Sequence, residues 1–86
     1  MSQAMQSEPV NQRSLSFGEK AVGLTFNPGG NPVVNDIKKQ FATTIDELNH
    51  LKNKSENPEV KRMYSIAITE AQTSQMWAVK AATWQY

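Results

Sequence analysis

The chain has 86 residues, which is room for one small domain, since most domains run to about 100–150 residues. It contains no cysteine and a single histidine, His50, which excludes disulfides, thiolate metal sites, a cysteine nucleophile and any two-histidine metal site. Nine basic against eight acidic residues give a net charge of +1, too balanced for a protein held on a DNA or RNA polymer mainly by charge. A chain this short rarely builds a strong core alone, so we expect self-association to supply part of its stability.

Neither a membrane span nor an export signal is evident. No apolar run approaches the ~20 residues of a spanning helix, and residues 1–14 lack an apolar signal core. We therefore expect a soluble protein of a reducing compartment. Residues 1–13 are polar and rich in Ser, Gln and Asn, which predicts a flexible tail before a single domain over residues 14–86.

A short helix is expected at the start of this domain. Ser16 and Glu19 form an S-x-x-E capping box, and Gly23 stands where a helix favours a left-handed C-terminal residue. About two turns are too short to persist alone, so an apolar side chain must anchor the helix elsewhere. We expect this anchor to be Phe17, Val22 or Phe26.

A turn-rich loop, TFNPGG, follows at residues 25–30. Two glycines after a proline allow a neighbour or a ligand to approach the backbone closely. An ordinary surface turn is the more common explanation of such a segment.

Two long helices are expected after the loop. Each begins with an Asn-Pro pair, at residues 31–32 and 57–58, in which Asn is a good N-cap and Pro suits the first helical position. The first runs to about Lys52 and the second to about Trp84. Because the polar break at residues 53–56 is short, the two helices should be antiparallel. An alternative start for the first is the pair at residues 35–36.

The long helices carry the apolar spacing of packed helices. One stripe on the first helix consists of Val34, Ile37, Phe41, Ile45, Leu48 and Leu51. A seam of small residues on the second is its natural partner: Val60, Tyr64, Ala67, Ala71, Ala78 and Ala82. A second apolar face of this helix, here called the tryptophan face, consists of Ile66, Thr73, Trp77 and Trp84.

The tryptophan face has no partner in a two-helix hairpin. Exposed tryptophans on a small protein usually mark an interface, so we expect an oligomer. The alternative is that the short helix folds over this face. The sequence thus predicts an all-α protein: a short N-terminal helix followed by a long antiparallel helical hairpin, assembling into an oligomer.

Catalysis finds little support in the residues. Asp46 and Glu47 are adjacent and diverge by ~100° around a helix, so they make no working carboxylate pair. His50 lies beside the apolar stripe, where a solvated or helix-capping role is the default. There is no phosphate-binding Gly-Lys loop and no G-x-G-x-x-G motif. We therefore expect that the protein is not an enzyme and binds no cofactor or metal. The lack of a metal site and of a catalytic base argues against a nuclease.

Ligand binding has better support. Arg62, Thr69, Thr73 and Lys80 fall on one strip that combines positive charge with hydroxyls and could hold phosphates. Flat aromatics could stack on nucleobases. Composition alone favours an ordinary solvated helix face, and the pair Lys38 and Lys39 likewise indicates a solvated edge unless the glycine loop brings a ligand there.

Four segments carry a resemblance to a known family. They are FGEKAVGLTFNPGGN at residues 17–31, IK at 37–38, SIAITEAQ at 65–72 and MWAVKA at 76–81. Over about residues 16–84 the chain resembles the phage anti-CBASS protein 2 family, the cyclic-nucleotide sponges that share a helical-hairpin domain with Thoeris anti-defence protein 1.

The resemblance implies a function that composition does not show. Family members bind the cyclic di- and trinucleotides of bacterial CBASS immunity and hold them without cleaving them, so the effector is not activated. It further implies a homohexamer of interlocked hairpins, acting in the cytoplasm of the infected bacterial host. The alternative is a small protein-interaction module that docks on another protein through Trp77 and Trp84.

The resemblance also implies binding residues. For a cyclic dinucleotide, between protomers, these are Phe17, Lys20, Phe26, Asn27, Gly29 and Gly30. For a cyclic trinucleotide, in a separate pocket of the long helices, they are Arg62, Ser65 and Thr69.

Two positions depart from the family pattern. Phe17 stands where a base-stacking Tyr is common, which keeps the stacking face without the hydroxyl. A lysine is expected a few residues past the FNP turn, where this chain has Asn31 and Pro32. Backbone N–H groups of the 29–30 turn could replace that phosphate contact.

Overall fold

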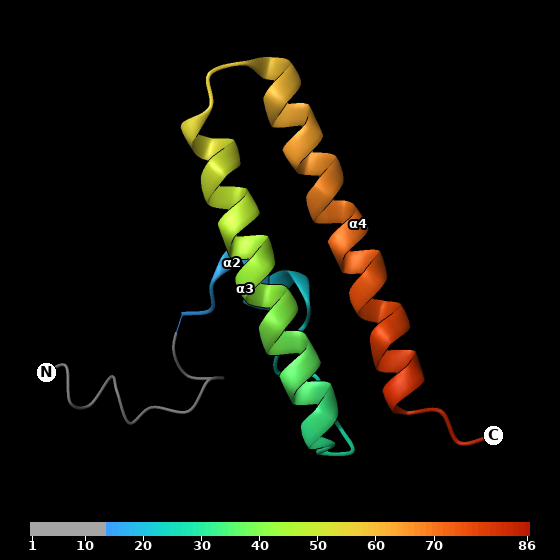
Figure 1. Cartoon of the computed structure of the whole chain (residues 1–86). Coiled ribbons are helices and arrows are strands. Elements are labelled where there is room, and N and C mark those ends of the chain that lie inside the picture. Colours follow the sequence, from blue (N-terminus) through green and yellow to red (C-terminus); the bar gives the residue numbers. More distant parts are fainter. Residues whose placement is uncertain (1–13) are drawn as a thin grey trace, which may run out of the picture.

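The computed structural model describes residues 14–86 and contains three helices over that range. Helix α2 (Phe17–Ala21) precedes the long helices α3 (Pro32–Lys54) and α4 (Pro58–Ala82), which run antiparallel (Figure 1). The predicted all-α architecture, a short helix followed by a helical hairpin, is confirmed. The expected flexible tail, residues 1–13, lies outside the described residues.

Both long helices begin as predicted. The Asn31 side chain accepts hydrogen bonds from the backbone N–H groups of Val33 and Val34, and the Asn57 side chain caps α4 in the same way. Helix α3 continues to Lys54, past the predicted end at Lys52, because no Gly or Pro interrupts it. Helix α4 ends at Ala82, before Trp84.

Helix α2 is short but well capped at both ends. The capping box is confirmed, with Ser16 Oγ accepting from the Glu19 N–H at 3.1 Å and Glu19 Oε1 accepting from the Ser16 N–H at 2.8 Å. At the other end Gly23 is left-handed, with φ of 62°. Its N–H bonds to the Lys20 carbonyl while the Leu24 N–H bonds to that of Glu19, which is a Schellman motif. The caps thereby provide hydrogen-bond partners for backbone groups at both ends of this five-residue helix, which is too short for two full turns.

The core lies where α2 and α4 both pack against α3. Its buried side chains are Val22, Leu24, Ala42, Ile45 and Ile68. Of the three alternative anchors, Val22 is buried, which confirms it, whereas Phe17 and Phe26 are 50% and 72% exposed. Leu24, next to the left-handed glycine, provides the second anchor.

A glycine in α2 permits the close approach to α3. A Cβ at Gly18 would lie 2.9 Å from the carbonyl carbon of Ala42 and closer still to its oxygen. The Gly18 N–H donates to Asp46 Oδ1 at 2.6 Å. Asp46 is therefore a docking residue for the first turn of α2.

The tryptophan face is bare. Ile66, Trp77 and Trp84 are 46%, 65% and 58% exposed. Helix α2 packs on α3 instead, so the expectation that the short helix covers this face is wrong for the described residues. No helix in the described part of the chain is long and apolar enough to cross a membrane.

Candidate functional site: a cleft at the open end of the hairpin

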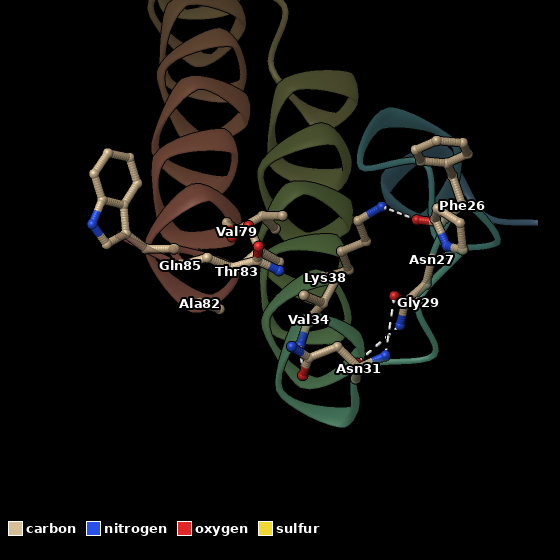
Figure 2. Close-up of a pocket in the computed structure, with 12 residues that line it drawn as sticks. Phe26, Asn27, Gly29, Asn31, Val34, Lys38, Val79, Ala82, Thr83 and Gln85 are labelled. Carbon is tan, nitrogen blue, oxygen red and sulfur yellow. Dashed lines mark hydrogen bonds between the residues drawn. The ribbon is translucent and has the colours of Figure 1, made fainter.

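A cleft of about 490 Å³ lies at the end of the hairpin where α3 begins and α4 finishes. Three segments form its walls: the loop before α3, the first turns of α3, and the end of α4 with the residues after it (Figure 2). The lining residues are Phe26, Asn27, Pro28, Gly29, Asn31, Val34, Lys38, Val79, Ala82, Thr83, Trp84 and Gln85. The cleft thus combines residues far apart in the sequence.

The loop wall is closed by two asparagines. Asn27 Nδ2 donates to the Asn31 carbonyl at 2.9 Å, and Asn27 Oδ1 accepts from the Asn31 N–H at 3.3 Å. Gly30, whose N–H bonds to the Asn27 carbonyl, has a φ of 63°, so it needs the left-handed freedom of glycine. Gly29 lies in open space, where an added Cβ meets nothing within 4 Å. Within the described residues, no neighbouring segment closely approaches the glycine pair. Close approach of a ligand, which the sequence also allows, stays a prediction.

The Lys38 side chain extends from α3 toward the loop, with its ammonium directed at the loop backbone (Figure 2). Its side chain is only 6% exposed. Lys38 Nζ donates to the Gly23 carbonyl at 3.0 Å and to the Phe26 carbonyl, and lies 5.5 Å from the centroid of the Phe26 ring. Burial lowers the pKa of this amine below its ordinary value, because a desolvated ammonium is disfavoured. The prediction of a solvated edge at residues 38–39 is wrong for Lys38 and confirmed for Lys39, which is exposed.

Lys38 is also the one formally charged residue that lines the cleft within residues 14–86. Sequence reasoning missed its role, although a signal was present. Lys38 stands four residues after Val34 and seven before Ile45, in line with the buried face of α3. A lysine in register with a buried stripe indicates an ammonium that must find partners inside the fold.

A second polar cluster lies on the tryptophan face. Lys80 Nζ is 5.0 Å from the centroid of the Trp77 ring and 5.7 Å from that of Trp84, within the range of cation–π attraction. Tyr86 packs edge-on against Trp84, with ring centroids 5.4 Å apart. Shallow hollows flank the cluster, one of about 430 Å³ beside Trp84 and one of about 260 Å³ beside Thr73.

Comparison with known protein families identifies the fold. The Acb2/Tad1 hairpin domain matches residues 19–83, which is most of the chain. The chain belongs to this family. Searches among curated proteins and among solved structures give no significant match. Acb2/Tad1 proteins are non-catalytic sponges, so membership implies a nucleotide-sponge role against bacterial defence and no enzymatic activity.

The cleft contains part of the dinucleotide set expected from the Acb2/Tad1 resemblance. Phe26, Asn27 and Gly29 line it, and Gly30 shapes the same loop. Phe17 and Lys20 do not line it; both are exposed on α2. The described chain therefore brings the loop residues together and leaves the two α2 residues outside.

The trinucleotide set expected from the resemblance lies on the outside of α4. Arg62 forms a salt bridge with Glu59, which holds the pKa of that carboxyl below its usual value, and both side chains are about 60% exposed. Thr69 Oγ1 donates to the Ser65 carbonyl at 3.1 Å. Neither the cleft nor the two hollows beside the tryptophan face is lined by Arg62, Ser65 or Thr69. Residues 14–86 hold no cluster of three or more His, Cys, Asp or Glu side chains that could bind a metal.

Proposed function

We propose that this protein binds cyclic di- and trinucleotide second messengers, cyclic GMP–AMP among them, and withholds them without cleavage. In this role it blocks effector activation in CBASS immunity, in the cytoplasm of an infected bacterium. The family match over residues 19–83 carries the proposal. The cleft supports it, because its chemistry fits a small anionic ligand with flat bases.

The fit rests on the kinds of group that line the cleft. Phe26 offers an aromatic surface, Asn27 and Thr83 offer neutral polar groups, and Lys38 supplies positive charge. No acidic side chain lines the cleft within residues 14–86, so no side-chain carboxylate there repels a phosphodiester. A volume of about 490 Å³ lies within the ordinary ~300–1,000 Å³ range of ligand sites.

The proposal also includes assembly of the protein into a homohexamer. Phe17 and Lys20 are exposed on α2, outside the cleft of their own chain. They contact ligand only where a second copy brings its cleft beside this α2. Arg62, Ser65 and Thr69 similarly form a trinucleotide pocket only with a neighbouring copy. Residues 14–86 act as the single hairpin domain.

Ligand is expected to raise the melting temperature of the purified protein. At a free concentration 100-fold above Kd, a ligand that binds only the native form adds about 2.7 kcal/mol, which corresponds to roughly 10–20 °C for a domain of this size. The measurement is a thermal melt with each member of a panel of cyclic di- and trinucleotides, followed by calorimetry on protein of known mass. Intact ligand should be recovered after the complex is heated. An unshifted melt with every member contradicts the proposal.

Substitution of two exposed phenylalanines distinguishes the loop cleft from a pocket shared between copies. Phe26→Ala should weaken cyclic GMP–AMP binding by about tenfold, because one stacking contact contributes about 1–3 kcal/mol. Phe17→Ala should weaken it similarly only if a second copy's α2 reaches the site. Neither change should unfold the hairpin, since both rings are at least half exposed. Unaltered affinity in both variants would rule out stacking by these rings.

The alternative is a protein-interaction module that docks through Trp77 and Trp84. The exposure of both indoles favours it. On this hypothesis the purified protein carries no nucleotide absorbance and does not respond to cyclic GMP–AMP in calorimetry.

A further inference from the structure

The buried cation at Lys38 requires an explanation. An ammonium taken out of water is strongly destabilised unless hydrogen bonds and charges compensate it. Lys38 is 6% exposed, and no carboxylate pairs with it among residues 14–86. A methionine would fill the same volume at lower cost. The amine must therefore do something for the fold that an apolar side chain could not.

Its two hydrogen bonds show what that is. The Gly23 carbonyl, which Lys38 Nζ contacts at 3.0 Å, also accepts the Phe26 N–H at 2.9 Å. The second acceptor of Lys38 is the carbonyl of Phe26 itself. One ammonium therefore holds both ends of the 23–26 turn, and beyond it the Asn27 and Asn31 bonds close the rest of the loop.

No other side chain on α3 bonds to this turn within the described residues. Asn31 Oδ1 caps α3 itself, and the hydroxyls of Thr43 and Thr44 bond within their own helix. The loop wall of the cleft, with Phe26 at its start, is thus tied to α3 by Lys38. A wall fixed before the ligand arrives spares the ligand the entropy of ordering it.

We infer that Lys38 is the positioning residue of the cleft: its ammonium fixes the 23–31 loop on α3 and thereby sets the affinity for an anionic ligand. The statement about affinity rests on the proposed function. The statement about the loop stands on the free protein alone. The same ammonium places the cleft's positive charge beside the loop, in the region from which the expected loop lysine is missing at Asn31 and Pro32.

Hydrogen exchange on the ligand-free protein tests the loop. Lys38→Met keeps the length of the side chain and removes the donor, and Lys39→Met, at the exposed neighbouring position, is the matched control. The Phe26 and Gly30 amides should exchange about tenfold faster in Lys38→Met and within about twofold of wild type in Lys39→Met. Amides in the middle of α4, such as Ile68, should be unchanged, which separates loop release from a general loss of stability. Protected loop amides in Lys38→Met overturn the inference.

Rescue and affinity complete the test. Lys38→Arg keeps charge and donors, so it should restore most of the loop protection; exchange as fast as in Lys38→Met would overturn the role of the cation. In calorimetry with cyclic GMP–AMP, Lys38→Met should raise Kd about tenfold or more, against about twofold or less for Lys39→Met. A released loop with unchanged Kd overturns the link to affinity. If wild type binds no cyclic nucleotide, the proposed function fails, while the exchange data still decide whether Lys38 holds the loop.

Discussion

Replacement of Gly18 by alanine is expected to lower the free energy of unfolding by about 3 kcal/mol, at the upper end of overpacking effects. The added Cβ would meet the backbone carbonyl of Ala42, and a backbone group cannot rotate out of the way as a side chain can. The hydrogen bond from the Gly18 N–H to Asp46 would be lost with the displacement. Urea denaturation at a fixed protein concentration measures the change.

Gly29→Ala is the matched control. An alanine Cβ at Gly29 meets nothing within 4 Å, and its φ is not positive, so stability should change by less than about 1 kcal/mol in either direction. Because α2 leads directly into the loop, Gly18→Ala should also abolish ligand binding. If Gly18→Ala unfolds at the same urea concentration as wild type, α2 is not seated on α3 as described.

Local signals explain why so much of the fold could be predicted. The capping box at Ser16, and the Asn-Pro pairs at 31–32 and 57–58, satisfy orphan N–H groups with neighbours in the sequence, so no knowledge of the fold is needed. The same holds for Gly23, whose left-handed conformation ends α2. Helix ends are harder to predict, because side-chain caps such as the Thr83 hydroxyl, which donates to the Val79 carbonyl, help to decide them.

The site could be predicted only in part, because its key contacts cross between elements. Gly18 and Asp46 are 28 residues apart, and nothing in either segment announces the other. The register of Lys38 with the buried face of α3 indicates burial, but its partners are backbone carbonyls, which carry no sequence signature. The family resemblance, not periodicity, predicts Phe26, Asn27 and Gly29 as binding residues; the fold brings them to one cleft, and their contact with a ligand stays a prediction.

The tryptophan face gives the second large expected effect, on assembly. Trp77 and Trp84 are each more than half exposed and flank the Lys80 ammonium, which leaves a wide apolar surface with one cation on it. A monomer gains nothing from such a surface, whereas a second copy that covers it buries two indoles. Truncation of a tryptophan at an interface centre commonly costs about 2 kcal/mol or more, so Trp77→Ala should weaken subunit association by about 30-fold or more.

Sedimentation or light scattering across a range of protein concentrations measures this effect. Trp77→Ala should shift the mass toward the monomer at concentrations where wild type is fully assembled, while its helical signal persists, because the exposed indole contributes little to the monomer and alanine favours helix. Thr43→Ala, at an exposed position on α3, is the control and should leave the mass unchanged. An assembled Trp77→Ala variant would place the contact between copies elsewhere. If wild type stays monomeric at every concentration, the tryptophan face is a docking surface for another protein. No other surface of the described chain has two exposed indoles around a cation.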